Sequence, residues 1–152
     1  MSDVYEIAPN LYLGDFGAAR TAYRDRFPTA FVVNATKDLA MLPEDAADGL
    51  RIPVDDNGTT AAVLGMLQAL PAACDAIAAA LAERRAVIVH CLAGQQRSPA
   101  VIAAYLMRER GWSPEEAVRF VRFKKPDAFF WSVNFQQTLE LWAGAGARAR
   151  VA

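Results

Sequence analysis

A cysteine and an arginine, Cys91 and Arg97, stand at the two ends of a short segment that could bind an anion and attack it. Cys91 follows a β-branched run at 87–90, and a helical pattern begins at Ser98. The segment between them has no hydrophobic period, so the cysteine lies at a strand-to-helix junction. Such junctions attract anions, because the first turn of a helix has unpaired N–H groups and the positive end of the helix dipole. Gly94 permits the tight curl that such a loop requires.

The chemistry that this spacing favours is attack of a thiolate on phosphorus. A free cysteine has a pKa of about 8.5, but a helix N-terminus and a nearby cation can lower that value to roughly 3.5–7.5. Cys91 would then be mostly ionised at neutral pH. The guanidinium of Arg97 and the N–H groups of the loop can hold the phosphate oxygens, and so offset the repulsion between thiolate and phosphate. The same donors would follow the phosphoryl group through the transition state.

Each of these residues also has an ordinary structural interpretation. Cys91 could be a small buried hydrophobic residue, His90 a hydrogen-bonded core histidine and Gly94 a loop glycine. These residue types together at a strand-to-helix junction favour the anion-binding interpretation. Cys74 stands alone in an alanine-rich helical stretch, and we expect it to be a buried structural residue.

The pattern His90-Cys91-x-x-Gly94-x-x-Arg97-Ser98 resembles the signature loop of the cysteine-dependent protein tyrosine phosphatases. The short chain is similar to the dual-specificity branch, and within it to the small atypical members with a single catalytic domain. The stretches at 11–15, 52–56 and 98–107 are also similar to this branch. The resemblance covers nearly the whole sequence, and it implies a hydrolase that works through a phosphocysteine intermediate without a cofactor or a metal.

The resemblance also assigns roles to individual residues. Cys91 is the expected nucleophile, and the Ser98 hydroxyl is expected to stabilise the Cys91 thiolate as it leaves the phosphoenzyme; Ser98 could also be a helix N-cap. His90 is expected to fix the loop without acting as acid or base, and Asn34 to brace it from a neighbouring strand. The expected substrate-binding residues, around a bound phosphate or sulfate, are Leu92, Ala93, Gly94, Gln95, Gln96 and Arg97.

A phosphatase also needs a general acid, because the leaving oxygen must be protonated as the P–O bond breaks. The resemblance places this acid at Asp56, on a segment leaving a strand that could lie beside the strand at 87–90. Asp55 is the alternative, and either aspartate could instead open the turn that ends at Gly58. The separation between Asp56 and Cys91 is longer than is usual in the family, and the insertion would fall at 57–60.

The sequence determines the substrate less well than the phosphate site. Leu92, Ala93, Gln95 and Gln96 are neutral, whereas a loop for a multiply phosphorylated inositol headgroup is expected to add cations there. The two glutamines could position water or touch substrate, but loop glutamines are most often merely solvated. The aromatic residues at 129–131 could stack on a phosphotyrosine ring, although we favour core packing for them.

Three cations, Arg122, Lys124 and Lys125, gather near the end of a predicted helix. They could contact a second phosphate or acidic residues beside the phosphorylated side chain. They could also simply interact favourably with the dipole of their own helix. Both interpretations stay open.

Length and composition predict one globular domain over 1–152, with a frayed tail at 144–152. A formal net charge of −1 argues against nucleic acid or a membrane surface as a partner, and residues 1–10 have no secretory pattern. Two cysteines are too few for a disulfide scaffold, and a reactive thiol requires a reducing compartment. We therefore expect a cytoplasmic protein whose partner is a phosphorylated protein or peptide.

The hydrophobic pattern alternates strands with helices. Pro71 is expected to kink or divide the second helix, and Ser113 and Ser132 are expected to cap the last two. The alternation implies an α/β fold with a central, mostly parallel sheet of four to five strands, helices on both faces, and a ligand site beyond the carboxyl ends of the strands. Strands are predicted at 5–8, 11–13, 31–33, 49–54 and 87–90, and helices at 17–24, 60–85, 99–110, 114–124 and 133–143.

The sequence therefore predicts a protein phosphatase that hydrolyses phosphotyrosine, with phosphoserine and phosphothreonine as further candidates. A phosphatase of a phospholipid, sugar or nucleotide is the main alternative. A rhodanese-like sulfurtransferase also uses a cysteine in a short anion-binding loop, but it has no use for a general acid at Asp56. A catalytically silent phosphate-binding module would have no need to keep the cysteine, the arginine and the candidate acid.

Overall fold

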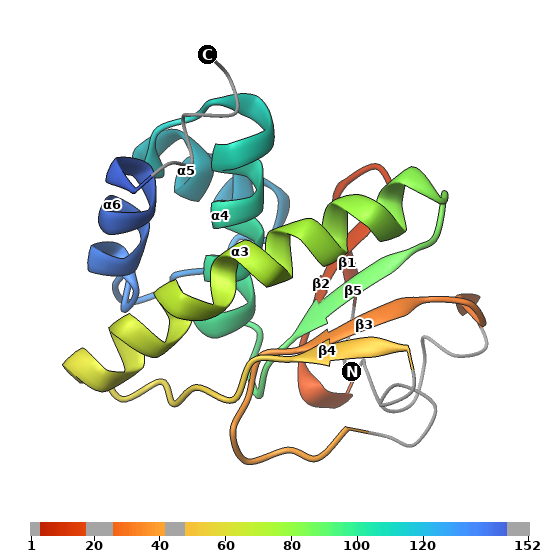
Figure 1. Ribbon diagram of the computed structural model, residues 1–152, viewed down its shortest axis with the longest axis horizontal. Helices are drawn as coiled ribbons and strands as arrows, with labels where there is room; N and C mark the ends of the chain where they lie inside the picture. Colours follow the sequence, from red (N-terminus) through yellow and green to blue (C-terminus); the bar gives the residue numbers. More distant parts are fainter. Residues whose placement is uncertain (1–3, 18–25, 42–47, 146–152) are drawn as a thin grey trace.

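The computed structural model describes residues 4–17, 26–41 and 48–145, and the strands in these ranges form one five-stranded sheet. The pairs β2–β5, β5–β3 and β3–β4 are parallel, and β1–β2 is antiparallel. The predicted mostly parallel sheet is confirmed, with β5 at its centre (Figure 1). The strands, in sheet order, are β1 (Val4–Ala8), β2 (Leu11–Gly14), β5 (Val87–His90), β3 (Phe31–Asn34) and β4 (Gly49–Arg51).

The register of the sheet brings the ends of three strands together. Gly14 of β2 and Asn34 of β3 both stand opposite His90 of β5. All four residues of β5 are buried, as expected for a central parallel strand with side chains packed on both faces. The loop that starts at Cys91 therefore leaves the carboxyl end of the central strand, where the sequence placed the ligand site.

The described helices build the main core on one face of the sheet. They are α3 (Thr60–Ala82), α4 (Arg97–Arg110), α5 (Pro114–Lys124) and α6 (Gln136–Gly144). In Figure 1, α3 crosses in front of the sheet while α4, α5 and α6 gather at one end of it. Helix α3 packs against β3 and β5, α4 against β2 and β5, and α5 against β1.

The opposite face of the sheet has a smaller apolar cluster. Its buried strand residues are Tyr12, Val32 and Ile88, and they pack with Ala30 and the partly buried Phe27. The rings of Tyr12 and Phe27 lie 4.6 Å apart between centroids. The helix predicted at 17–24 lies outside the described residues, apart from Gly17.

Helix α3 runs without interruption through Pro71, so the division into two helices that the proline suggested does not occur. Its start is fixed by Thr59, whose hydroxyl oxygen accepts a hydrogen bond of 3.2 Å from the Ala62 N–H. By length and composition the helix could cross a membrane, but eight of its residues, between Ala62 and Ala80, are buried in the core. Packing against β3, β5, α4 and α6 accounts for the apolar character of that face.

The end of α4 and the start of α5 lie where their residues predict, although α4 begins at Arg97, two residues earlier than expected. Helix α4 stops at Gly111, which adopts the left-handed conformation with φ of +67°. Helix α5 has the predicted capping box: the Ser113 hydroxyl accepts from the Glu116 N–H at 3.2 Å, and the Glu116 carboxylate accepts from the Ser113 N–H at 2.9 Å. Local sequence is enough to set these ends.

Helix α6 begins later than predicted. Phe135 occupies its N-cap position and the helix starts at Gln136, so the prediction that Ser132 caps it is wrong. Ser132 is instead held by side chains: its hydroxyl donates to Asn134, and its carbonyl accepts from Gln96. The tail predicted to fray from 144 onward is helical at its first residue, and residues 146–152 lie outside the described ranges.

The strand predicted at 49–54 is shorter and lies elsewhere than expected. Strand β4 ends at Arg51 and pairs with β3 at the edge of the sheet, so β3 separates it from β5. Ile52 still donates to the Asn34 carbonyl at 2.8 Å. The chain that leads to Asp56 thus approaches the end of β5 across β3, rather than from a strand beside β5.

Candidate active site

The loop that begins at Cys91 is curled tightly against β2. Cys91 is 2% exposed. Gly94 has φ of +70°, and a Cβ added there would lie 3.1 Å from the Gly14 carbonyl oxygen. The left-handed backbone and the close contact both disfavour a side chain, which explains the glycine. The Phe16 N–H donates to the Leu92 carbonyl at 3.2 Å and holds the start of the loop from the same side.

The Cys91 sulfur lies 3.1 Å from the Ser98 hydroxyl oxygen. Ser98 is fully buried and is the second residue of α4, so its role as an N-cap is not realised. Gln96 takes the N-cap position without a capping hydrogen bond from its side chain. A hydroxyl at this distance can donate to a thiolate, and the positive end of the α4 dipole also favours negative charge at this sulfur.

Arg97, the first residue of α4, is also buried, at 7% exposure. Its Nη1 donates to the Val54 carbonyl at 3.1 Å. The guanidinium therefore connects the Cys91 loop to the segment that carries Asp56. A guanidinium has five N–H donors in a planar fork, so a side chain held in this way still has donors for an anion in the loop.

His90 and Asn34 stand opposite each other at the ends of β5 and β3. The His90 Nδ1 is 3.4 Å from the Cys91 carbonyl oxygen, and burial lowers the pKa of His90 below its usual value of 6.5. The ring is therefore neutral at neutral pH. The Asn34 side chain bonds to Thr36 and to the Leu39 carbonyl, so it orders the segment after β3, and the direct bracing of the Cys91 loop that we predicted for it is not among its bonds.

The two candidate acids face different neighbours. The Oδ1 of Asp56, which is exposed, accepts a hydrogen bond of 2.8 Å from the Asn134 side-chain amide. Asp55 is half-buried and forms an ion pair of 3.5 Å with Lys37. Asp56 thus faces the chain before α6, which adjoins the Cys91 loop, while Asp55 is drawn toward the segment after β3. The chain bends at Asn57, and Gly58 has φ of +71°.

Gln95 and Gln96 fasten the loop to residues 127–134, so they are not the merely solvated residues that their position suggested. Gln96 is 8% exposed, and its amide donates to the Ser132 carbonyl at 2.7 Å. The Gln95 carbonyl accepts from the Phe129 N–H at 2.7 Å, and its side chain donates to Asp127 at 3.4 Å. The two glutamines therefore hold the segment at 127–134 beside the Cys91 loop, where it forms a wall of the site.

Asn134 joins the segment at 127–134 to the candidate acid, and no pattern in the sequence singles it out. Its N–H donates to the Gln96 Oε1 at 2.9 Å, its side-chain amide donates to Asp56, and its Oδ1 accepts from the Ser132 hydroxyl. The partners Gln96 and Asp56 are 38 and 78 positions away in the chain. No local pattern in a single sequence records contacts over such separations.

The three aromatic residues at 129–131 divide between core and surface. Phe129 is fully buried and has φ of +56°, a conformation that a bulky residue rarely adopts. Arg122 holds it there, since its Nη2 donates to the Phe129 carbonyl at 2.6 Å. Phe130 is exposed, Trp131 is 86% exposed, and the two rings pack edge to face. Core packing therefore explains the first residue only.

The nearby cations are mostly engaged within the protein. Arg122 bonds to the carbonyls of residues 128 and 129. Lys125 is buried and pairs with Asp127. Burial, the largest single cause, would raise the pKa of the Asp127 carboxyl, but the contacts with Lys125 and the hydrogen bonds from Gln95 and the backbone together bring the pKa below its usual value. Lys124 lies over aromatic rings of α5. These contacts favour structural roles over recognition of a second phosphate.

Within the described ranges, no group of three histidine, cysteine, aspartate or glutamate side chains could hold a metal ion. Cys74 is fully buried in α3, in agreement with the structural role expected for it. The site combines a buried thiol beside a hydroxyl, a buried guanidinium, and a carboxyl from another segment.

Comparison with known proteins adds independent information. Residues 11–144 match the family model of the dual specificity phosphatase catalytic domain. Dual specificity phosphatase 28 of Mus musculus is 32% identical over 144 residues, which cover 90% of this chain and 86% of the mouse protein. The Homo sapiens protein of the same name is 35% identical over 133 residues, covering 83% of this chain and 72% of its own.

Solved structures show the same fold. The crystal structure of human DUSP28 matches with a TM-score of 0.78 and 29% identity, covering 93% of each chain. That of DUSP15 matches with a TM-score of 0.80 and 23% identity, covering 97% of this chain and 91% of its own. At 23% identity, the similarity to DUSP15 concerns the fold alone.

Proposed function

The chain belongs to the dual-specificity phosphatase family, and is thus a phosphoric monoester hydrolase; from this premise we propose that it hydrolyses phosphotyrosine in proteins or peptides. Phosphoserine and phosphothreonine are further candidate substrates. The observation that carries the proposal is the buried Cys91 sulfur at the end of β5, 3.1 Å from the Ser98 hydroxyl at the start of α4. This arrangement suits a nucleophile that must later leave.

In the first step, the Cys91 thiolate attacks phosphorus in line with the leaving oxygen. The S–P bond forms, the P–O bond breaks, and the leaving oxygen takes the proton of the Asp56 carboxylic acid. Arg97 and the N–H groups of the loop hold the other phosphoryl oxygens. The products are a phosphocysteine, a free alcohol or phenol, and an ionised Asp56.

In the second step, water attacks the phosphocysteine and Asp56 accepts one proton from that water. The O–P bond forms and the S–P bond breaks, so inorganic phosphate is released and the sulfur takes the electron pair as a thiolate. The Ser98 hydroxyl can donate a hydrogen bond to that thiolate. Asp56 is again a carboxylic acid, and the cycle needs no metal or cofactor.

Asp56 is the favoured acid because its contacts keep it on the side of the phosphate loop. Asn134 holds Asp56 and Gln96 at once, and Gln96 adjoins Arg97 at the start of α4. Asp55 faces Lys37 instead. Asp56 is exposed, and a group that must exchange a proton with both substrate and water needs such access.

The surroundings of the loop support an aromatic substrate over a polyphosphorylated one. The exposed loop residues Leu92 and Ala93 are neutral and apolar. Phe130 and Trp131 are exposed on the wall that Gln95 and Gln96 hold beside the loop. A phosphotyrosine bound at Cys91 would place its ring against an apolar rim. A loop for a multiply phosphorylated headgroup would need more cations.

We also propose that the loop from Cys91 to Arg97 binds inorganic phosphate or sulfate, and that the protein acts in the cytoplasm. The buried guanidinium and the start of α4 support the first proposal. The second follows from chemistry, because a thiolate nucleophile stays active only where thiols remain reduced.

The experiment that tests the proposed function is turnover of an aryl phosphate and of a phosphotyrosine peptide by the wild type and by Cys91→Ser. Loss of the nucleophile should lower turnover on the order of 10⁵-fold or more, while phosphate still binds. Cys74→Ser is the matched control and should keep turnover. Mass spectrometry of the quenched wild-type reaction should show a phosphate adduct on Cys91.

Two results would contradict the proposal. Full activity of Cys91→Ser would remove the nucleophile from the mechanism. Phosphate binding without any adduct or turnover would indicate a silent binding module instead. A panel that includes phosphoserine and phosphothreonine peptides and phospholipids then ranks the candidate substrates.

A further inference from the structure

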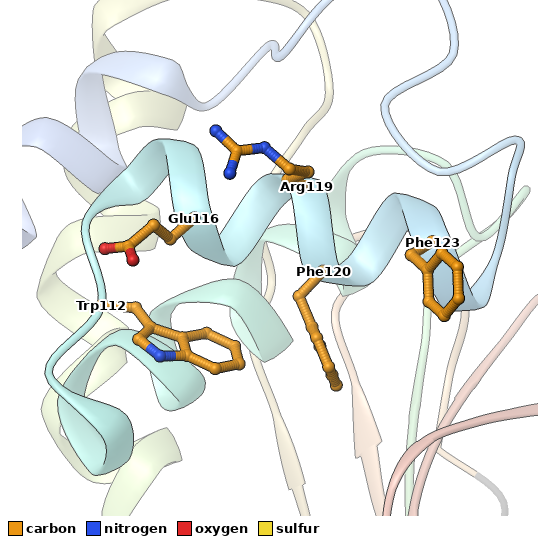
Figure 2. Close-up of a pocket in the computed structure, with 5 residues that line it drawn as sticks. All are labelled: Trp112, Glu116, Arg119, Phe120 and Phe123. Atoms are coloured by element: carbon orange, nitrogen blue, oxygen red, sulfur yellow. The ribbon is translucent and has the colours of Figure 1, made fainter.

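A second concave surface lies on α5, apart from the residues of the candidate active site. It is a groove of about 370 Å³ lined by Trp112, Glu116, Arg119, Phe120 and Phe123. Figure 2 shows the rings of Trp112, Phe120 and Phe123 along one side of α5, with the Glu116 carboxylate near Trp112 and the Arg119 guanidinium across the helix. Positions 116, 120 and 123 share one helix face, because they are four and three residues apart.

Cations alternate with the rings of this groove. The Arg110 guanidinium lies 5.0 Å from the Trp112 ring centroid and 5.4 Å from that of Phe120. The Lys124 ammonium lies 5.5 Å from the Phe120 centroid and 5.9 Å from that of Phe123. These contacts hold both charges at the apolar surface.

Packing of the protein itself explains only part of this surface. Trp112 and Phe120 pack against the main core, and their rings lie 5.0 Å apart. Phe123 is 80% exposed, so the packing of the protein itself leaves most of this ring uncovered at the groove. Glu116, the acidic residue of the lining, has its carboxylate in the α5 capping box. The groove is therefore an apolar surface with a positive edge.

We propose that the α5 groove binds a short acidic segment of a partner protein. One aromatic or aliphatic side chain of the segment would lie against Phe120 and Phe123, and its carboxylates would pair with Arg110 and Lys124. Charge complementarity is the reason for an acidic partner: the cations are already held at the rings, so little side-chain freedom is lost when they pair.

Other ligand classes fit this groove less well. Single-stranded nucleic acid is bound along a positively charged groove that follows several phosphates, whereas this site is one short concave surface with few cations. An anionic membrane surface is typically bound by four to eight clustered cations or by a protruding apolar face. This site is concave and has few cations, and Glu115 is exposed beside it. A side chain of a protein segment fits a concave site better.

The test is an NMR titration of the ¹⁵N-labelled protein with three matched pentapeptides. The first has a tryptophan between two pairs of glutamates, the second replaces the tryptophan with serine, and the third replaces the glutamates with lysines. The first peptide should shift the Trp112 indole N–H and the α5 amide signals, with saturation in the millimolar range. The other two should cause much smaller shifts.

Variants then connect the binding to the groove. Phe123→Ser and Lys124→Glu should each weaken binding of the first peptide about tenfold, since each removes one of the two proposed contacts. Leu64→Ser removes an exposed apolar side chain from α3, and Arg84→Glu reverses a charge after the same helix; both should bind as the wild type does. Unchanged turnover of an aryl phosphate by the Phe123→Ser variant shows that the fold is intact.

Several results would overturn the proposal. The first is the absence of any Trp112 or α5 shift at millimolar peptide, and the second is an equal response to the lysine peptide. Binding to phosphatidylserine vesicles or to polyuridylate that Phe123→Ser abolishes, without peptide binding, would assign the groove to a membrane or to nucleic acid. Shifts of the same signals with protein concentration alone would assign it to a second copy of the chain.

Discussion

The two halves of the candidate active site are held in place by different means. Cys91, Arg97 and Ser98 belong to one stretch that runs from the end of β5 into the first turn of α4, and all three are buried. Asp56 and Asn134 come from segments 78 positions apart and are joined by one hydrogen bond between their side chains. The phosphate-binding half is part of the core, while the acid half is attached to it.

The difference has an energetic consequence. Moving the first half would require the end of a central strand and the start of a packed helix to shift, and buried packing resists such changes. The second half depends on the chain of hydrogen bonds from Gln96 to Asn134 to Asp56, and a typical hydrogen bond contributes only about 0.5–1.5 kcal/mol net. Phosphate binding and proton transfer should therefore be separable by mutation.

Among the changes that distinguish the two halves, the largest effect should come from Arg97→Lys, which keeps the charge but removes the planar fork of donors. Lysine cannot hold two phosphate oxygens and the Val54 carbonyl in the same geometry. We expect kcat/KM for an aryl phosphate to fall on the order of 10³-fold. Arg85→Lys is the matched control, because Arg85 precedes the start of β5, at the opposite end of the strand from Cys91. This change should leave kcat/KM almost unchanged. Near wild-type activity of Arg97→Lys would show that a positive charge is enough at this position and that the planar guanidinium is not required.

The acid half should fail in a way that depends on the leaving group. Asp56→Asn is expected to lower turnover of an alkyl phosphate about 10²-fold or more, because a poor leaving group needs the proton. Turnover of nitrophenyl phosphate, whose leaving group is good, should change little, and phosphate affinity should stay the same. Stopped assays with both substrates measure this. If Asp55→Asn shows this pattern and Asp56→Asn does not, then Asp55 is the acid.

A smaller effect of the same kind should follow from Asn134→Ala. Asn134 is a positioning residue, so its loss should reduce turnover of the alkyl phosphate about tenfold and leave nitrophenyl phosphate unaffected. In the Asp56→Asn background the second change should have no further effect, which a merely structural role would not produce. Gln137→Ala, exposed on α6, is the matched control. If the losses caused by Asn134→Ala and Asp56→Asn are additive in the double variant, Asn134 does not act through Asp56.

The same contrast explains which features the sequence could predict. The Cys91 loop, the mostly parallel sheet, the Gly111 stop and the Ser113 capping box all depend on neighbouring residues or on the strand and helix periods. Local chemistry is enough to specify them. Gly94 could also be predicted, because the tight curl of the loop requires a residue that adopts a positive φ, and its φ is +70°.

The errors have in common that a distant partner decided the outcome. Ser132 looks like a helix cap, but its carbonyl accepts a hydrogen bond from Gln96 and its hydroxyl donates to Asn134. Helix α6 therefore begins at Gln136, three residues later than predicted. Pro71 does not divide α3, which has buried residues on both sides of the proline and packs against the sheet, α4 and α6. Asn134 itself was missed, because its partners lie 38 and 78 positions away.

The smallest effect should appear in the stability of the buried half as the pH changes. Burial holds the pKa of His90 below 6.5, so the unfolded chain takes up a proton before the folded protein does. The stability that depends on neutral His90 is complete above about pH 6.5, and it is lost as the pH falls through the lower pKa of the folded state. The urea midpoint should therefore decrease as the pH is lowered from about 8 to about 5, and His90→Asn should flatten this slope.

Asp127, whose pKa is also lowered, loses its contribution only below about pH 4, outside this range. An unchanged slope in His90→Asn would mean that a group other than His90 accounts for the loss of stability in this pH range.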